Sequence, residues 1–451
     1  MKYSMCYMLL PVLILLCVPN SFSQNPIIRD QFSADPSARV FNGRVYVFPS
    51  HDIPTPPEKP GRKDWFCMED YHVFSSPDLV DWIDHGVIVR QNRVAWVDST
   101  TYSMWAPDCI ERNGKYYFYF PAYKKIPGTH GEKSFGIGVA VSGSPEGPYV
   151  PQPDPVEGVH GIDPNVFIDK DGQAYLYWAQ GEIYVAQLKD NMMALASDPQ
   201  IVKNLPAKGL KEGPWLFERK GIYYMTYPHV QNRIERLEYA MGDNPMGPFE
   251  FAGVIMDESP LGCWTNHQSL VKFKDQWYLF YHQDALSPDF DKNRSVCIDS
   301  LFFNADGTIR KVKPSLRGVG AINAAQKIEI DHYSQKSSKG VSVVFLDPLN
   351  RFRGWKTLLN DKDSWIRYNA VDFWKRKHNI VRVKARAEAG CILQIRLDRL
   401  EGTLLSEIKI PEGAGWKTVD SPVFNYERGI HDLFVVLKNN PVEIDWIQFA
   451  D

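Results

Sequence analysis

The sequence predicts an all-β protein, a five-bladed β-propeller followed by a β-sandwich domain of the jelly-roll type. Three observations predict this fold class. A turn followed by an aromatic strand occurs five times, no stretch between these repeats keeps the 3.6-residue period of a long helix, and a strand-rich segment follows a Pro- and Gly-containing stretch. Together they indicate two domains built from short strands.

The repeat consists of a tight turn and a strand in which aromatic residues alternate. Its copies are the segments 42–48, 113–119, 171–177, 220–226 and 274–280. Their central tyrosines, at positions 46, 117, 175, 224 and 278, are separated by 71, 58, 49 and 54 residues. A four-stranded blade with its loops needs about 40–60 residues, so the spacing favours a propeller over two stacked β-sandwiches.

The order of segments along the chain predicts the domain boundaries. Lys2, an apolar run from Met8 to Val18 and the small residues Ser21 and Ser23 indicate a signal peptide over residues 1–23. We expect the propeller over 24–314, with a turn at Asp306-Gly307 closing the ring, a linker over 315–326 and the β-sandwich over 327–451. The protein is therefore expected to be secreted, to a periplasm or beyond.

Composition excludes several classes of function. The net charge is −3 and no long basic run is present, so we expect no nucleic-acid partner. Beyond the leader, no apolar segment is long enough to span a membrane. Five cysteines remain after residue 23 without a CxxC pair, which disfavours a zinc site of that type and leaves one disulfide open. We expect a monomer.

An ionisable residue precedes every turn at nearly the same distance. These residues are Asp35, Asp108, Asp163, Glu212 and His267, which lie 6–9 residues before their turns. If the strand before each turn is the innermost of its blade, the five side chains converge on the axis. Each could instead be an ordinary turn residue, as Asp before Pro often is, but that alternative does not explain the common phase.

Converging carboxylates suit acid–base catalysis, because burial and mutual repulsion push their pKa values apart. One can stay ionised and activate water while another holds a proton for a leaving oxygen. This is the chemistry of glycosidic bond hydrolysis, and in an inverting enzyme the two groups lie roughly 6.5–9.5 Å apart.

Motifs at these positions resemble glycoside hydrolase family 43 over about residues 25–314. They are Asp35-Pro36, Trp105-Ala106-Pro107-Asp108, Asp163-Pro164-Asn165-Val166-Phe167, Glu212-Gly213-Pro214 and Asn266-His267-Gln268-Ser269. The resemblance implies a five-bladed propeller and an inverting glycosidase. It implies that Asp35 is the general base, Glu212 the general acid, and Asp163 the residue that orients the acid and tunes its pKa.

The resemblance also implies roles for residues around the triad. His267 is similar to an axial histidine often associated with bound calcium, which we expect it to hold through water. It is also expected at the substrate site, and a channel histidine with only water partners is the alternative. Arg294 is similar to an arginine that contacts the substrate or the acid, with a surface ion pair as the alternative. Trp105 and Asp108 are expected at the substrate site, Trp105 as a pocket wall or a packed blade residue.

The C-terminal segment resembles a family 6 carbohydrate-binding module. Ile328-Glu329-Ile330-Asp331 and Ile444-Asp445-Trp446 are among the matching motifs. Glu329, Asp331 and Asp445 match positions that often bind a structural calcium. Glu443 stands where the family commonly has an asparagine that helps hold the sugar, so a packing role for this domain is an alternative to sugar binding.

The expected function is an α-L-arabinofuranosidase that removes side chains from a plant polysaccharide. A β-xylosidase, an arabinanase and a β-galactosidase remain alternatives within the family, and a non-catalytic glycan-binding protein is an alternative of another class. The long insertion from His51 to Asp70 is expected to form part of the rim of the site. No organic cofactor is expected, and calcium is the one candidate ion.

Overall fold

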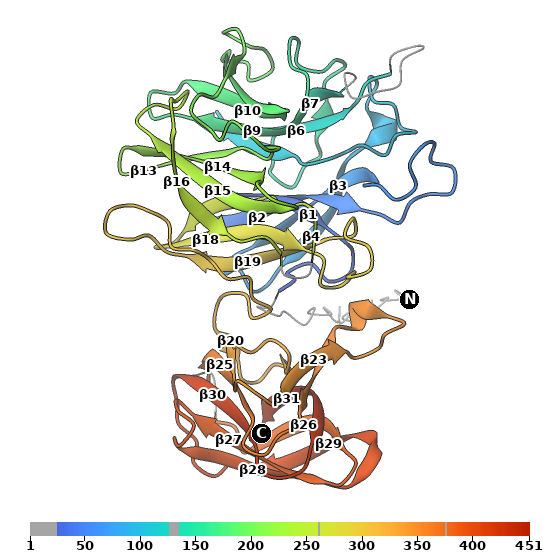
Figure 1. Ribbon diagram of the computed structural model, residues 1–451, viewed down its shortest axis with the longest axis vertical. Helices are drawn as coiled ribbons and strands as arrows, with labels where there is room; N and C mark the ends of the chain where they lie inside the picture. The colour runs from blue at the N-terminus through green and yellow to red at the C-terminus, as the bar shows by residue number, and fades with distance from the viewer. Residues whose placement is uncertain (1–24, 126–134, 260–261, 375–376) are drawn as a thin grey trace, which may run out of the picture.

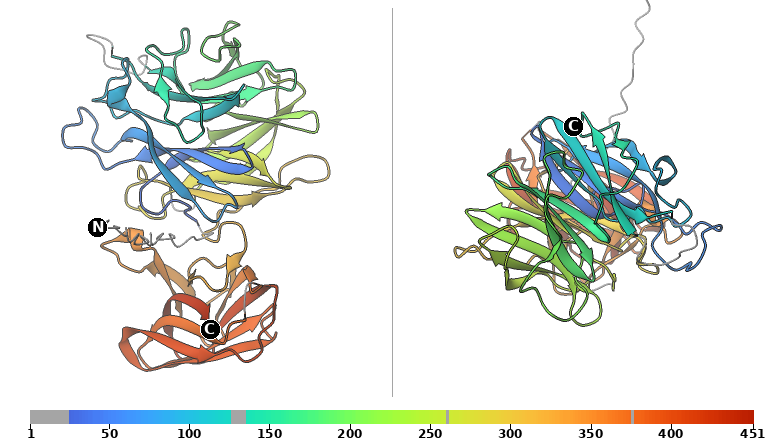
Figure 2. Two further views of the ribbon diagram at one scale, coloured as in Figure 1. Left: turned by 180° about the vertical axis from the view of Figure 1, so that it is seen from behind. Right: turned by 90° about the horizontal axis from the view of Figure 1, so that it is seen from above.

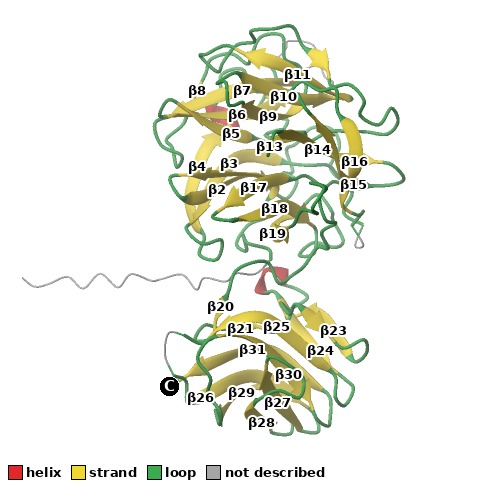
Figure 3. Ribbon diagram, turned by 90° about the vertical axis from the view of Figure 1, so that its left-hand side faces the viewer, coloured by secondary structure: helices red, strands yellow, loops and turns green. Residues whose placement is uncertain are grey.

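The computed structural model describes residues 25–125, 135–259, 262–374 and 377–451. The predicted signal peptide lies outside the described residues. The described chain is almost entirely β-structure, arranged as two bodies joined by a narrow neck (Figures 1 and 3). Within these residues no helix is long and apolar enough to cross a membrane.

The larger body contains five successive antiparallel sheets. The first sheet is β1 (Ala34–Phe41), β2 (Arg44–Asp52), β3 (Met68–Ser76) and β4 (Ile83–Arg90). The second is β5 (Asp108–Arg112), β6 (Lys115–Tyr123), β7 (Phe135–Ser142) and β8 (Val150–Pro151), and the third is β9 (Ile162–Ile168), β10 (Ala174–Gln180), β11 (Glu182–Leu188) and β12 (Gln200–Ile201). The fourth is β13 (Trp215–Arg219), β14 (Ile222–Val230), β15 (Glu235–Gly242) and β16 (Glu250–Met256), and the fifth is β17 (Ser269–Phe273), β18 (Gln276–Gln283) and β19 (Ser295–Leu301).

The sequence repeat marks the hairpin between the first and second strand of every sheet. At the turn between β1 and β2, Asn42 and Gly43 have φ of 50° and 74°, and at the turn between β5 and β6, Asn113 and Gly114 have φ of 54° and 74°. Asn and Gly tolerate the left-handed region better than other residues, which explains their place in these tight turns. Tyr46 and its counterparts lie on the second strands, as predicted.

The first and fifth sheets are bonded to each other although they are far apart in sequence. The Ser269 hydroxyl at the start of β17 donates to the Pro36 carbonyl oxygen at 2.5 Å and accepts from the Ala38 amide at 2.9 Å. The apolar faces of neighbouring sheets form the core, in which Phe48, Phe118, Tyr177 and Tyr224 are fully buried. Figure 2 shows these sheets from behind and from above.

The smaller body is a sandwich of two sheets. One sheet has the order β20 (Ile322–Asn323), β25 (Trp365–Asp372), β30 (Ile430–Leu437), β27 (Cys391–Leu397) and β28 (Leu404–Ile410), with β22 (Gln335–Lys336) beside β25. The other has the order β23 (Val341–Phe345), β24 (Trp355–Leu359), β31 (Val442–Ala450), β26 (Ile380–Ala387) and β29 (Gly413–Pro422), with β21 (Ile328–Glu329) beside β31. Two 3-10 helices are described, η1 (Gln91–Arg93) and η3 (Arg351–Arg353).

The predicted linker over 315–326 contacts both bodies. Its first residue, Ser315, donates from its hydroxyl to Asp299 Oδ1 at 2.6 Å, and its β20 segment pairs in parallel with β25. The linker is therefore divided between the two bodies. Further contacts join them: His332 Nε2 lies 2.9 Å from the Asn25 carbonyl oxygen, and the rings of Phe32 and Phe352 are 4.6 Å apart.

Candidate active site

A cavity of about 820 Å³ opens at the ends of the first strands of the sheets. Four of the five residues that share the repeat phase line this cavity, namely Asp35, Asp163, Glu212 and His267. Arg294 and Trp105 line it as well. The structure thus brings together most of the residues that the sequence placed at the axis.

Asp35 lies at an irregularity of β1, with a φ of 48° and a shift in strand register between Ala34 and Ser37. Its carboxylate receives Arg294 Nη1 on Oδ1 at 2.8 Å and Nη2 on Oδ2 at 3.2 Å, and the Ser50 hydroxyl donates to Oδ2 at 2.7 Å. Burial by itself would raise the pKa of Asp35, but Arg294 and the other neighbouring groups lower it to about 2. Asp35 is therefore ionised at any ordinary working pH.

Arg294 bridges two buried carboxylates. Besides Asp35 it contacts Asp52, with Nε 3.0 Å from Oδ2 and Nη2 3.0 Å from Oδ1. The Arg294 side chain is 3% exposed, which excludes the surface ion pair considered for this residue. Its planar donor fork fixes the orientation of Asp35 and compensates the charge that is buried there.

His282 holds the backbone of Asp35. Its Nδ1 accepts from the Asp35 amide at 3.1 Å, and its Nε2 lies 3.0 Å from the Thr265 carbonyl oxygen. Only the neutral tautomer with the proton on Nε2 satisfies both contacts. Burial lowers the pKa of His282 to about 3, which agrees with a neutral ring.

Asp163 is placed by the same device as Asp35. Its φ is 56°, and the register of β9 against β10 shifts beside it. The Gly213 amide donates to Asp163 Oδ2 at 2.9 Å. Burial raises the pKa of Asp163 well above its ordinary value, and the charges of Glu212 and Asp35 add to this effect.

Glu212 lies in the segment that enters β13, next to Gly213. Burial raises the pKa of Glu212 and the charge of Asp35 raises it further, while a hydrogen bond with Glu235 and the charge of Arg294 act in the opposite direction. Asp35 and Glu212 thus differ in the direction of their pKa shifts inside one cavity. This is the division of labour that general base and general acid require.

Asp108 does not line the cavity, which corrects the expectation that it contacts substrate. Its side chain is saturated by donors, namely the Ser37 hydroxyl, Arg39 Nε and Nη2, Asn165 Nδ2 and the amides of Cys109 and Val166. β5 pairs with β6 in regular register from Asp108 onward, so its side chain stays between the sheets. Asp108 is a buried structural carboxylate that ties three sheets together.

His267 lines the cavity beside the base, with its Nδ1 3.8 Å from Asp35 Oδ1. Burial lowers the pKa of His267, which favours the neutral ring that a metal or a substrate hydroxyl would need. Among the described residues, no group of three His, Cys, Asp or Glu ligands gathers around it. A calcium ion at His267 would therefore have to take its other ligands from water rather than from side chains.

The insertion between β2 and β3 forms part of the cavity wall, as the sequence predicted. Trp65 and Phe66 line the cavity and contact Trp264, with ring centroids 6.3 and 6.5 Å away. Trp105 also lines it, and its buried indole Nε1 has no hydrogen-bond partner among the described residues. The aromatic rings suit the apolar face of a sugar, whereas the buried Nε1 of Trp105 is not exposed to the cavity.

Sequence reasoning missed the residues that support the triad. Asp52, His282 and Glu235 carry no motif of their own, and they lie on second or third strands rather than at the repeat phase. Only the neighbouring motif residues could have drawn attention to them.

The described cysteines are all buried and unpaired, so the disulfide that had been left open is absent among them.

Outside the cavity, one group of described residues offers metal-ligand geometry. Ligand atoms of His51, Asp70 and His72 lie within 4.8 Å of one another. Asp70 is already bonded to His51 at 2.7 Å and to Arg90 at 2.8 Å, and His72 is bonded to Asp84. Because Arg90 already supplies a positive charge beside Asp70, a metal cation at this position would be repelled. The three residues therefore belong to an ion-pair network on the first sheet.

The predicted calcium residues of the smaller body fit an ion only in part. Both carboxylate oxygens of Asp331 are buried without a donor, and burial raises the pKa of Asp331 to about 8. Asp445 is instead paired with Lys384 at 2.8 Å. Among the described residues, Glu329, Asp331 and Asp445 do not place their ligand atoms within 4.8 Å of one another.

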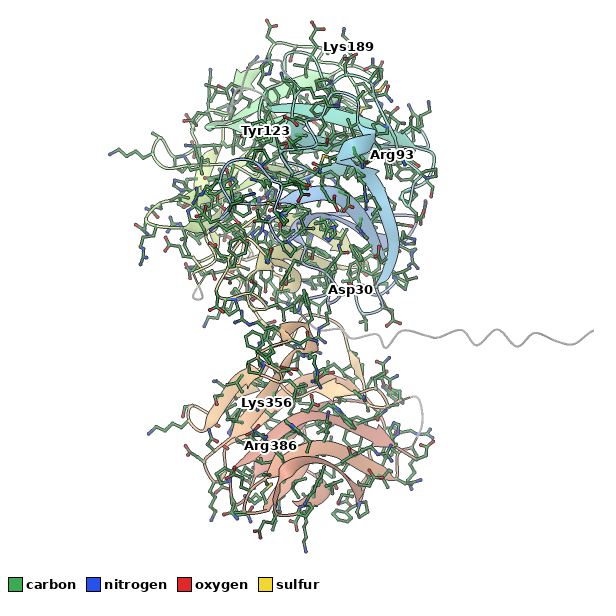
Figure 4. All side chains as sticks on the ribbon, turned by 90° about the vertical axis from the view of Figure 1, so that its right-hand side faces the viewer. Asp30, Arg93, Tyr123, Lys189, Lys356 and Arg386 are labelled. Carbon is green, nitrogen blue, oxygen red and sulfur yellow. The ribbon has the colours of Figure 1, made fainter. Side chains whose placement is uncertain are left out.

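Glu443 is held in an ion-pair network rather than left free. It contacts Arg386 and Lys356 at 2.7 Å each, and both cations lie near the Trp416 ring (Figure 4 labels Lys356 and Arg386). The network occupies the position where an asparagine was expected to hold sugar.

Comparisons with known proteins agree with this site. Residues 23–309 match the model for glycosyl hydrolases family 43, and residues 333–451 match the carbohydrate binding module (family 6). Xylosidase/arabinosidase 43A of Humicola insolens is 36% identical over 64% of this chain and 99% of its own, and arabinoxylan arabinofuranohydrolase of Paenibacillus polymyxa is 27% identical over 95% of this chain and 74% of its own. The crystal structure of a family 43 β-xylosidase/α-arabinofuranosidase from a compost microbial metagenome, with xylotriose and without calcium, is 34% identical with a TM-score of 0.57, over 65% of this chain and 98% of its own.

The family 43 match covers the five sheets of the larger body, the cavity and the carboxylates that line it. This chain belongs to glycosyl hydrolases family 43 and is a glycosidase that carries a C-terminal carbohydrate-binding module.

Proposed function

We propose that this protein is an inverting, exo-acting α-L-arabinofuranosidase that removes arabinose side chains from arabinoxylan. The observation that carries the proposal is the pair Asp35 and Glu212, two carboxylates in one cavity whose pKa values are shifted in opposite directions. Such a pair supplies a base and an acid at the same pH.

In this mechanism Asp35 accepts a proton from water as that water attacks the anomeric carbon. Glu212 gives its proton to the glycosidic oxygen as the carbon–oxygen bond breaks, and the configuration at the anomeric carbon inverts. The Gly213 amide donates to Asp163 Oδ2 and holds this carboxyl group beside the Glu212 segment, from which Asp163 orients the acid and tunes its pKa.

The five sheets support a closed five-bladed propeller. The bonds of Ser269 to Pro36 and Ala38 join the fifth sheet to the first, and the innermost strands β1, β9 and β13 deliver Asp35, Asp163 and the segment of Glu212 to one cavity. A closed ring accounts for this convergence.

The substrate assignment rests on the cavity and on the relatives. The names of relatives cover both xylosidase and arabinosidase activities, and two relatives that match over 95% of this chain are named arabinoxylan arabinofuranohydrolase. The aromatic walls from Trp65, Trp105 and Trp264 suit a single terminal pentose. A β-xylosidase is the second candidate, because relatives covered almost completely by this chain carry that activity in their names.

A panel of 4-nitrophenyl glycosides separates these candidates. We expect turnover of the α-L-arabinofuranoside, with the released sugar first seen as the inverted anomer by proton NMR. Turnover of the β-D-xyloside alone would establish the second candidate, and turnover of the β-D-galactoside alone would indicate a β-galactosidase. Release of oligosaccharides from debranched arabinan would indicate an arabinanase. No turnover of any substrate would favour the non-catalytic glycan binder.

We further propose that calcium binds the smaller body at Asp331, because an ion would satisfy its two buried oxygens. Lys384 would have to release Asp445 for that residue to join. We also propose that His267 binds an axial calcium through water, that the leader over residues 1–23 directs secretion, and that the protein is a monomer.

A further inference from the structure

We propose that Glu235 is a neutral carboxylic acid that donates a hydrogen bond to Glu212 and thereby positions the general acid. The inference rests on the proposed role of Glu212. Glu235 is a further carboxyl group at the site, and unlike the triad it does not touch the substrate.

Glu235 is the first residue of β15, and it lies behind the cavity wall. It is 1% exposed and does not line the cavity. Its amide donates to the Trp264 carbonyl oxygen at 3.0 Å, and its Oε2 accepts from the Asn266 amide at 2.6 Å. Trp264 and Asn266 both line the cavity, so Glu235 is fixed against the wall from within.

The remaining oxygen of Glu235 defines the inference. Oε1 is buried and has no hydrogen-bond donor among the described residues, and the side chain placed to share a hydrogen bond with Glu235 is that of Glu212. Two carboxyl groups can share a hydrogen bond only if one of them carries a proton. The bond between Glu212 and Glu235 therefore contains a proton.

The surroundings place that proton on Glu235. Glu212 and Asp163 are the titratable groups that face Glu235, and both are acidic, so an ionised Glu235 would place its charge in a buried space beside two further carboxyl groups. Glu212 also faces Asp35 and the cation Arg294 and is more accessible to solvent than Glu235. Burial raises the pKa of Glu235 well above its ordinary value, in agreement with a neutral acid.

A neutral donor has two effects on the general acid. It fixes one oxygen of Glu212, which leaves the other to carry the proton for the glycosidic oxygen. It also stabilises the carboxylate that Glu212 becomes as it gives up this proton, so the bond strengthens as the leaving group departs. Glu235 is thus a positioning residue that acts through Glu212.

Replacement by Met and by Gln separates the hydrogen bond from the bulk of the side chain. Gln can accept from the Asn266 amide through its oxygen and donate to Glu212 through its amide nitrogen, whereas Met can do neither. We expect Glu235→Met to lower kcat/KM about 10- to 100-fold on an aryl glycoside with a poor leaving group, with little change on the 2,4-dinitrophenyl glycoside, which needs no acid. The alkaline limb of its pH profile of kcat/KM should move to higher pH, because the Glu212 carboxylate loses the hydrogen-bond donor that stabilises it. Glu235→Gln should remain close to wild type.

Controls keep the outcome independent of folding and of the sugar assignment. Activity on the 2,4-dinitrophenyl glycoside reports folded enzyme, and the glycone is whichever sugar the wild-type enzyme accepts. Glu238→Gln changes another buried carboxyl on β15, bonded to His229 and Arg236, and should not alter the dependence on leaving group. Before Glu235 is tested, kcat/KM of Glu212→Gln must be shown to depend strongly on the leaving group. A weak dependence in Glu212→Gln would overturn the assignment of Glu212 as the general acid.

Two results would overturn the inference alone. If kcat/KM of Glu235→Met depends on the leaving group as in wild type, the bond to Glu212 has no role. If the alkaline limb of the pH profile of Glu235→Gln moves to lower pH, Glu235 is charged in the wild-type enzyme. The infrared difference spectrum between wild type and Glu235→Gln at neutral pH should contain the carbonyl band of a neutral carboxylic acid. Absence of this band would also contradict the proposal.

Discussion

Asp35 and Arg294 form the most consequential pair of residues in the cavity. The folded-state pKa of Asp35 is lowered from 3.8 to about 2, so its contribution to stability is present above pH 3.8 and is lost as the pH falls towards 2. The shift corresponds to about 2 kcal/mol. Denaturant unfolding between pH 2 and 6 should show a smaller acid dependence in Asp35→Asn than in wild type, and equal slopes would contradict the assigned pKa.

Arg294 compensates two buried carboxylates at once, so its loss should cost stability as well as activity. Arg294→Met leaves Asp35 and Asp52 without their cation, and breaking a buried pair typically costs about 3–5 kcal/mol. We expect a clear fall in the thermal midpoint, partly restored by adding Asp52→Asn. A double variant no more stable than the single one would indicate that the loss comes from packing.

At the scale of elements, the segment that enters β13 couples Glu212 to Asp163. Gly213 has a φ of 52°, and a Cβ there would lie 2.8 Å from Pro228 Cγ and 3.1 Å from His267 Cε1. We expect Gly213→Ala to displace the amide that binds Asp163 and to lower kcat at least 10-fold, as positioning errors near an acid do.

Gly43→Ala is the matched control for this variant. Gly43 also has a positive φ, of 74°, but a Cβ there meets nothing within 4 Å. Backbone strain of a similar size should lower the thermal midpoint of Gly43→Ala, while its kcat stays unchanged. An equal loss of kcat in both variants would mean that strain, rather than the contact with Asp163, explains the effect.

The insertion between β2 and β3 contributes Trp65 to the cavity and to the aromatic contact with Trp264. We expect the Trp65 ring to stack on the bound sugar with an energy similar to that of an aromatic pair, about 0.5–1.5 kcal/mol, so Trp65→Ala should raise KM up to about 10-fold with a smaller change in kcat. Initial rates on the preferred aryl glycoside test this. A fall in kcat at constant KM would place Trp65 in the chemical step instead.

Much of each sheet could be predicted from sequence, because the tight turns need residues that tolerate positive φ and the strands alternate aromatics at period two. Asp108 lies at nearly the same distance from its turn as the cavity residues, but this distance alone does not determine the direction in which a side chain points. The prediction that Asp108 lies at the substrate site was therefore wrong. Asp35 and Asp163 lie at irregular register with φ of 48° and 56°, whereas Asp108 lies in regular register and points between sheets.

The supporting residues could not be predicted for a different reason. Arg294 meets Asp35 across 259 positions of sequence, and His282 meets it across 247. Contacts at this separation depend on how the fifth sheet docks on the first, which no local pattern encodes. The Glu235 contact likewise needs the position of β15 relative to β13.

For the whole molecule, calcium should act on the smaller body. If an ion satisfies Asp331, calcium should raise the thermal midpoint of the domain that contains it, and chelation by EDTA should reverse the gain. Asp331→Asn should abolish the response while turnover of a small aryl glycoside stays unchanged. An equal calcium response in Asp331→Asn would place the ion elsewhere, with His267 as the next site to test.

The Trp65 and Trp264 rings at the cavity wall also provide an optical probe. A sugar that enters the cavity must change the environment of at least one indole, so the intrinsic emission of the unlabelled protein should report occupancy in real time. Stopped-flow traces with a Glu212→Gln variant, which binds but turns over slowly, would then separate the rate of sugar entry from the rate of bond cleavage.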